Sequence, residues 1–231
     1  IWPVSPADFL CMLAALAMTT GCQNKPTETA DSTNAAADSV VAESPLDNAV
    51  VRAIMDRRSV RKYKPEPVPK EMLDVILHCG INAPNAMNEQ RWEVRVTNSK
   101  AFIDGVTKVF VESAENDERV QKLVKNPDFH NMFRNAPTVI FVAGKADEKS
   151  SPIDCGMLGE NIMLAAQSMG LGTCCLGSAA GFLNSNPGAA NYLKQLAFSD
   201  GYELLYAIAI GYPDESPEAK PRDASKIRYI E

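Results

Sequence analysis

Residues 137–143 (PTVIFVA) limit the possible folds more than any other stretch of the sequence. The stretch is apolar almost throughout, with no charged side chain. A strand of this kind has to be covered on both faces, because a strand with one solvated face alternates between apolar and polar residues. Residues 203–211 (ELLYAIAIG) have the same character. We therefore predict that both stretches are buried strands at the centre of a sheet.

Helices outnumber strands in the rest of the sequence. Apolar spacing and capping residues predict helices over residues 46–58, 69–82, 99–114, 116–125, 154–169 and 186–198. Further strands are predicted over residues 92–97, 170–177 and 226–230, and the last of these has no obvious partner nearby in the sequence. Because paired helices precede the first strand, an α+β fold is favoured over a regular βαβ winding.

The first 45 residues differ from the rest. Residues 9–18 are ten apolar residues, which suits a signal-peptide core and is too short to span a bilayer. They lead into TTGC (19–22), which resembles the lipobox of bacterial lipoproteins, where the cysteine is acylated. Thr19 stands where leucine is usual, and residues 1–8 contain no Lys, Arg or Met. The alternative is a buried helix or a cloning remnant.

Residues 23–45 support the lipoprotein interpretation. They are rich in Ala, Ser, Thr, Asp and Glu and contain no aromatic side chain, so burial cannot offset the entropy of ordering them. We predict a signal peptide over residues 1–22, a flexible linker over 23–45 and a folded domain over 46–231. Acylated Cys22 would hold the domain at the bacterial cell envelope, and the alternative location is the cytoplasm.

Composition excludes some functions. The 231 residues carry 23 Lys and Arg against 29 Asp and Glu, and the net charge of −6 argues against non-specific binding to nucleic acid. Two histidines are too few for a His-rich metal site, so no metal is predicted.

Two polar segments are candidates for ligand binding. Five cations lie within eight residues at positions 57–64 (RRSVRKYK), and a phosphate ester needs such charges and directional donors. The alternative is a solvated basic face at a helix end. Residues 83–92 (APNAMNEQRW) carry amides that could meet the imide edges of a heterocycle, or form an ordinary polar turn.

Two further segments contain glycine or cations. Residues 170–177 (GLGTCCLG) begin like a dinucleotide fingerprint, but Cys175 replaces the third glycine and the glycines precede a strand instead of following one. These glycines instead allow a backbone to approach a flat ligand closely. Lys220 and Arg222 could complete an anion clamp or belong to a solvated linker. Cys79, Cys155, Cys174 and Cys175 are predicted to be buried thiols, with a disulfide among them as the alternative.

In order along the chain, these motifs resemble the nitroreductase family of FMN-dependent oxidoreductases. The motifs are RRSVR (57–61), APNAMNEQ (83–90) with Trp92, GLGTC (170–174), and GYP (211–213) with KPR (220–222). The resemblance covers about residues 46–231. It implies an α+β fold with a mostly antiparallel central sheet flanked by helices. It also implies an intertwined homodimer in which residues 227–231 join the partner's sheet, with one FMN in each of two interface sites.

The resemblance implies roles for individual residues. Arg57 and Ser59 would bind the FMN phosphate and ribityl chain, and Arg61 would reach the pyrimidine edge. Lys220 and Arg222 would close on the phosphate.

Other candidates would contact the flavin differently. Asn88 of the partner subunit would contact the flavin, and the backbone of Cys175, Leu176 and Gly177 would lie against the ring near N5. Arg58 would serve either packing or binding. Arg91 stands where the family usually has proline, which puts the geometry of that turn in question, and Asn85 replaces a serine.

The implied reaction is ping-pong hydride transfer from NADH or NADPH through FMN to a small acceptor such as a nitroaromatic or quinone. The residues that select the acceptor are expected within residues 108–134, where no motif identifies them. Because reduced nicotinamides are not normally available outside the cytoplasm, export would require another electron donor. The alternatives are a non-enzymatic lipoprotein that binds a flavin or corrinoid-type ligand, and a specialised reaction such as reductive dehalogenation or flavin destruction.

Overall fold

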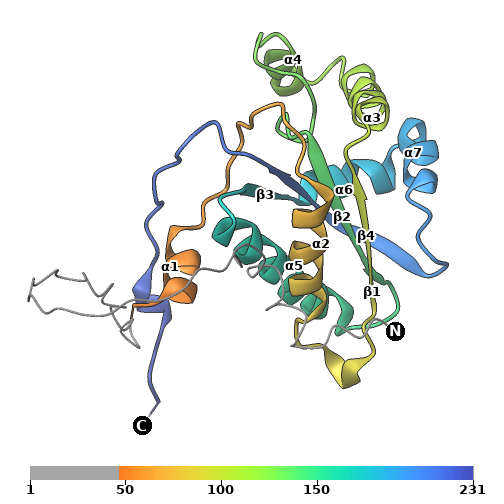
Figure 1. The fold of residues 1–231 in the computed structure, drawn as a ribbon. Helices are drawn as coiled ribbons and strands as arrows, with labels where there is room; N and C mark the ends of the chain where they lie inside the picture. Colours follow the sequence, from red (N-terminus) through yellow and green to blue (C-terminus); the bar gives the residue numbers. More distant parts are fainter. Residues whose placement is uncertain (1–46, 231) are drawn as a thin grey trace, which may run out of the picture. The chain divides into compact units, whose positions relative to one another are not determined.

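Figure 1 shows a computed structural model of the protein, which describes residues 47–230. The predicted signal peptide (1–22), acylation site (Cys22) and linker (23–45) lie outside the described residues. Among those residues, no helix is both long enough and apolar enough to cross a membrane.

The core of the fold is a four-stranded sheet in the order β1-β2-β4-β3. Its strands are β1 (Trp92–Thr97), β2 (Thr138–Lys145), β3 (Gly172–Leu176) and β4 (Tyr202–Gly211). Every neighbouring pair is antiparallel; Val139 pairs with both Thr97 and Ala209. The two apolar stretches are the central strands β2 and β4, which confirms the prediction of an antiparallel sheet with a buried middle.

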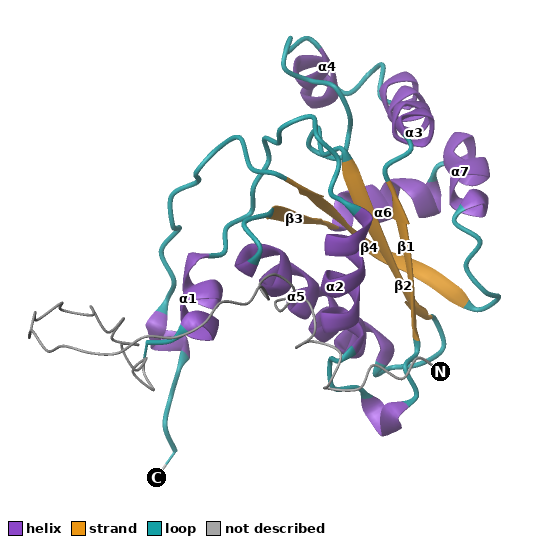
Figure 2. Cartoon of the chain, viewed as in Figure 1, coloured by secondary structure: helices purple, strands orange, loops and turns teal. Residues whose placement is uncertain are grey.

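Helices cover both faces of this sheet (Figures 1 and 2). The side chains of α2 (Lys70–Ile81) and α5 (Ser151–Ser168) pack with Ile140 and Val142 of β2. On the other face, α3 (Lys100–Ser113) and α6 (Gly177–Ser185) pack with Val139 and Phe141 of the same strand. Alternate residues of β2 therefore pack into the hydrophobic cores on the two faces of the sheet, which explains why the strand is apolar throughout.

The helix starts follow the predicted capping chemistry. The Ser99 hydroxyl accepts a hydrogen bond from Phe102 N at 3.3 Å and begins α3 as expected. The first helix, α1 (Ala49–Asp56), is shorter than the predicted 46–58, because the backbone leaves helical geometry at Arg57 (ψ 130°). The basic segment after it is consequently extended. The polar helix α4 (Glu118–Val124) is capped by Asp117, close to the predicted boundary.

Two predictions about the second half of the chain need correction. The single helix expected over residues 186–198 is a short turn, η2 (Pro187–Ala189), followed by α7 (Ala190–Gln195). The helix α6, which starts directly after β3, was not predicted; glycines at 177 and 181 obscure its apolar spacing.

The C-terminal residues form no strand within the single chain. A turn, η3 (Ala224–Lys226), is followed by an extended tail in which Ile227, Tyr229 and Ile230 are 71%, 90% and 87% exposed. A strand needs a neighbour to bond with, and residues 227–230 bond to no other part of residues 47–230 as a strand.

Candidate functional site

The basic segment after α1 lies along the β3 edge of the sheet. Val60 N donates to Thr173 O at 2.9 Å, and Ser59 and Thr173 form an isolated parallel bridge. A Cβ on Gly172 would lie 2.8 Å from the Val60 side chain, so only glycine allows this approach. The structure thus brings together the RRSVR and GLGTC motifs, which lie more than 100 residues apart in the sequence.

The arginines of this segment have few partners. Arg57 Nε lies 4.0 Å from Glu160 Oε1, at the limit of an ion pair, and Arg61 Nη1 donates to Ser59 O at 2.9 Å. Arg58 differs, because its Nη1 donates to Met55 O at 2.6 Å and to Arg57 O at 2.9 Å. Arg58 therefore caps the end of α1, whereas Arg57 and Arg61 keep most of their donor capacity for a ligand.

The end of β3 is open beside these cations. Cys175 and Gly177 are exposed, and Leu176 between them is buried in the core. A Cβ added to Gly177 would meet no described atom within 4 Å. The backbone at Gly177 is therefore accessible, and its contact with a flat ligand stays a prediction.

Thr173 carries a buried polar atom that lacks a partner. Its hydroxyl is buried on β3 and makes no hydrogen bond to any of residues 47–230. Buried hydroxyls are normally satisfied, and one without a partner often marks a site where a ligand or another chain supplies the bond. This atom lies on the residue that pairs with the basic segment.

The charges of three arginines act on the Cys174 thiol of β3. Burial raises the pKa of the Cys174 thiol, while the charges of Arg61, Arg134 and Arg57 act in the opposite direction. Arg134 was not singled out from the sequence. It follows α4 by ten residues, lies on left-handed backbone, and belongs to no local pattern that sequence reasoning could use.

Tyr63 fixes the basic segment to the sheet. Its hydroxyl donates to Val60 O at 2.6 Å, and Ala209 O of β4 lies 3.3 Å from it. Burial raises the pKa of Tyr63, so the hydroxyl remains a neutral donor. The sequence showed this residue beside the cations but gave no reason to assign it a positioning role.

The amide-rich segment forms a tight turn elsewhere in the molecule. Ala86 N lies 3.3 Å from both carboxylate oxygens of Asp154, and Asn85 Oδ1 accepts from Gln90 N at 2.9 Å. Asn88 is exposed within η1 (Ala86–Asn88) and has a φ of 54°. Figure 1 draws this turn (yellow) beyond the ends of α2 and β1.

Asn88 and the RRSVR segment are not brought together within one chain. No hydrogen bond or ion pair among residues 47–230 joins Asn88 to Arg57, Ser59 or Arg61. Arg91, which replaces the usual proline, stabilises the turn instead. Its Nη1 donates to Glu148 Oε2 at 2.8 Å, and it also pairs with Glu89.

The arm that carries Lys220 and Arg222 starts against the basic segment. Arg61 N donates to Glu215 Oε1 at 2.5 Å, and Asp214 N donates to Lys62 O at 2.9 Å. Lys220 and Arg222 themselves are exposed, and Arg222 Nη1 donates only to Lys220 O within the described chain, at 3.3 Å. The structure places the arm at the site without closing its cations over it.

The four described cysteines are all free thiols, so the alternative of a disulfide among them is not realised. Cys155 and Cys174 are buried as predicted, and burial raises the pKa of Cys155 to about 11. Cys79 and Cys175 are exposed, which corrects the prediction of four buried thiols.

Comparisons with known proteins show which family and fold the chain resembles. Residues 54–212 match the sequence profile described as Nitroreductase family. The NADPH-flavin oxidoreductase of Vibrio harveyi is 29% identical over 76% of this chain and 70% of its own length. The FMN reductase [NAD(P)H] of Bacillus subtilis is 26% identical over 76% of this chain and 70% of its own. A crystal structure of a nitroreductase with bound FMN from Desulfitobacterium hafniense has a TM-score of 0.71 and 26% identity, covering 80% of this chain and 99% of that one.

Proposed function

The chain belongs to the nitroreductase family, and we propose on that premise that it transfers hydride from NAD(P)H, through bound FMN, to a small nitroaromatic or quinone acceptor. The observation that carries this proposal is the β3 edge. There, the sparsely bonded cations Arg57 and Arg61 lie on the segment that pairs with β3, and β3 ends at Gly177, where no side chain covers the backbone.

The residues at this edge fit FMN. Its phosphate needs cations and directional donors, which Arg57 and Ser59 offer, and Lys220 and Arg222 follow on the arm. Its flat ring needs backbone without a protruding side chain, which Gly177 offers. The unsatisfied Thr173 hydroxyl is a further polar group at this edge that a ligand could bond.

Bound FMN supplies the hydride chemistry, and the protein binds it, orients it and tunes its potential. Arg61 would hold the pyrimidine edge of the flavin, and its guanidinium would favour the negative charge that reduction brings there. Hydride transfer requires no acid–base dyad in the protein. Tyr63 keeps Arg61 in place by fixing the segment on which both residues lie.

A second copy of the chain would complete the site. α1 buries none of its residues in the single chain, and Val50, Ile54 and Met55 on it are all more than half exposed. Together with the exposed apolar tail at 227–230, they form surfaces that a homodimer would cover. Asn88 of the partner subunit would then reach the flavin. Deleting residues 227–231 should shift the sedimentation coefficient towards that of a monomer and lower the FMN content.

As a separate proposal, acylated Cys22 anchors the domain to the bacterial cell envelope; an anchored domain outside the cytoplasm would need an electron donor other than NAD(P)H. The support is the apolar run, the lipobox-like end and the polar linker of residues 9–45. Replacing Cys22 by serine should move the protein from the membrane fraction to the soluble fraction. If the protein with Cys22 intact is already found in the soluble fraction, the proposed anchor is contradicted.

The visible spectrum of the purified protein tests the proposed function. We expect flavin absorption in the blue that bleaches when NADH or NADPH is added without oxygen and returns when a quinone or nitroaromatic is supplied. A coloured protein that is not bleached by either nicotinamide would instead be a flavin-binding protein. A protein that stays colourless after reconstitution with FMN would contradict the proposal entirely.

A further inference from the structure

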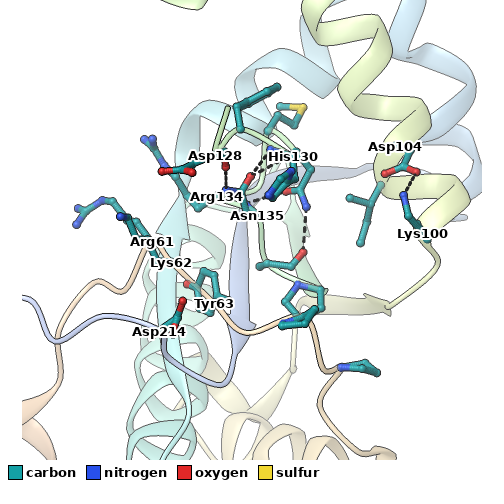
Figure 3. A pocket seen from close by; sticks show the side chains of 18 of the residues that line it. Arg61, Lys62, Tyr63, Lys100, Asp104, Asp128, His130, Arg134, Asn135 and Asp214 are labelled. Carbon is teal, nitrogen blue, oxygen red and sulfur yellow. Dashed lines mark hydrogen bonds and ion pairs between the residues drawn. The ribbon is translucent and has the colours of Figure 1, made fainter. Parts of the chain in front are cut away.

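A cavity of about 840 Å³ opens beside Arg61, between residues 61–67, the start of α3 and residues 126–137 (Figure 3). Its volume is typical of sites for small organic ligands, which span roughly 300–1,000 Å³. Part of its lining is apolar and suits a flat ring, with Ile103, Phe129 and Met132 among the residues there. The cavity adjoins the proposed flavin site, because Arg61 belongs to both.

The charged groups of the cavity are unevenly paired. Four cations (Arg61, Lys62, Lys100, Arg134) face three carboxylates (Asp104, Asp128, Asp214). Only Lys100 and Asp104 form an ion pair within the described chain. Figure 3 shows that pair on one side of the cavity and Arg61, Lys62 and Arg134 on the other, where Asp128 and Asp214 also lie without forming an ion pair with them in the described part of the chain. One side of the cavity therefore presents several cations without ion-pair partners.

Arg134 is held in place by its own turn. Arg134 and Asn135 both have left-handed backbone, with φ of 59° and 63°, a conformation that costs energy for residues other than glycine. Asn131 Oδ1 accepts from Phe133 N and Asn135 N at 2.9 and 3.1 Å, while Asn135 Oδ1 accepts from His130 N and Asn131 N at 2.8 and 2.9 Å.

The base of this turn is equally fixed. The Phe133 side chain is fully buried and packs edge-on against Phe141 of β2, with 5.8 Å between the ring centroids. The Arg134 side chain, by contrast, forms no hydrogen bond or ion pair with any of residues 47–230 and is exposed. A fixed turn that presents an unpaired guanidinium at a cavity supports the hypothesis that this residue binds a ligand.

We propose that Arg134 determines acceptor specificity by binding the carboxylate of an aromatic acceptor whose ring lies in this cavity. The inference rests on the proposed function and names the substrate class of the same site. A planar guanidinium with free donors matches a carboxylate in two-point geometry. A phosphate of a nicotinamide dinucleotide shares this oxyanion chemistry, and the test separates the two sources.

The test uses the full-length, flavin-loaded protein and two acceptors of similar shape, 4-nitrobenzoate and neutral 4-nitrobenzamide. We expect Arg134→Met to lower kcat/KM for nitrobenzoate by about 10- to 100-fold, mainly through KM, and to change kcat/KM for nitrobenzamide by less than about twofold. Arg134→Lys should restore part of the loss. Lys70→Met, which removes an exposed cation of α2 outside the cavity, is the matched control and should change neither value.

A binding measurement separates recognition from turnover. Titration calorimetry with benzoate, which cannot be reduced, should show binding to the wild-type protein and weaker binding by at least tenfold to Arg134→Met. Arg134→Gly relieves the left-handed strain, so it should fold at least as stably as wild type and still lose benzoate binding. A merely structural role for Arg134 predicts the reverse: Arg134→Gly would keep benzoate binding.

Each failure has a distinct meaning. Equal losses with both acceptors, or none with nitrobenzoate, would overturn the role of Arg134 and leave the proposed function intact. Slower reduction of the flavin by NADPH, or by both nicotinamides, with benzoate binding unchanged, would assign Arg134 to a donor phosphate and overturn the carboxylate assignment. Wild-type protein that reduces a quinone but neither nitro acceptor would overturn this inference alone. Wild-type protein that reduces none of the three would contradict both the proposed function and this inference.

Discussion

The two edges of the sheet both carry arginine, and they use it differently. At the β1 edge, Arg95 donates to Leu196 O at 2.8 Å, to Ala197 O at 2.7 Å and to Glu93 Oε2 at 2.6 Å. At the β3 edge, Arg57 has a single ion pair at 4.0 Å and Arg61 bonds to one carbonyl. An arginine with several partners stabilises the fold, whereas one with few is available to a ligand. This difference supports the proposal that β3 is the functional edge, without reference to any motif.

The β3 edge should show the larger effect on ligand binding. Arg61→Ala removes a charge-assisted contact, which contributes about 1.5–3 kcal/mol, so FMN affinity should fall about 10- to 100-fold. Fluorescence titration of the flavin-free protein with FMN measures this change. The melting temperature of the flavin-free variant should stay near the wild-type value, since Arg61 makes few internal contacts. Unchanged flavin content and activity would refute the assigned role of Arg61.

The β1 edge should show the opposite behaviour. Arg95→Ala removes hydrogen bonds to two carbonyls of the segment 196–197 and the stacking of the guanidinium over Phe198, 5.1 Å from the ring centroid. We expect the free energy of unfolding to fall by about 1–3 kcal/mol, measured by urea denaturation. The FMN affinity of the folded variant should not change. An Arg95→Ala variant that binds FMN more weakly but has the wild-type free energy of unfolding would contradict the contrast between the two edges.

Thr173 offers a smaller and more selective test at the β3 edge. Thr173→Val keeps the shape of the side chain and removes the buried hydroxyl that lacks a partner. The flavin-free protein should therefore become more stable by about 1 kcal/mol, as measured by thermal denaturation. Destabilisation would mean that the hydroxyl is already satisfied in the single chain. Weaker FMN binding by the stabilised variant would make this hydroxyl part of the flavin site.

Sequence patterns predicted the parts of the fold that depend on burial. β2 and β4 were recognised because contact with a core on each face leaves no position for a polar residue. The basic segment and the glycine-containing strand were recognised as motifs, and the bridge between Ser59 and Thr173 explains why they occur together.

Other features depend on tertiary structure and left no local pattern. Arg134 is one cation among many in the sequence, and only the left-handed turn and the cavity distinguish it. The helix α6 contains glycine at its first and fifth positions, so its apolar spacing was lost among residues typical of loops. The tail at 227–230 has the composition of a strand but no partner strand within the described chain, so its conformation cannot be inferred from composition alone.

Glu93 tests the β1 edge by pH, with the smallest expected effect. Burial raises the pKa of Glu93, but hydrogen bonds from Ser199 and the charge of Arg95 outweigh burial and lower it below its ordinary value of 4.5. The folded state therefore favours the charged form, and this stabilisation is present above pH 4.5 and lost as the pH falls through the lower, folded-state pKa.

Glu93→Gln should reduce the free energy of unfolding at pH 7 by about 0.5 kcal/mol, since the partners are only partly shielded from solvent. The difference in free energy of unfolding between wild type and Glu93→Gln should narrow as the pH falls below 4.5. The wild-type carboxylate becomes protonated there and is then neutral, as glutamine is. Urea denaturation between pH 3 and 7 measures this difference in the free energy of unfolding. Glu112→Gln, whose exposed partner Lys108 lies 3.7 Å away on α3, is the control and should show no such gap. A gap for Glu93→Gln that is constant with pH would show that packing, and not charge, holds the β1 edge to residues 196–199.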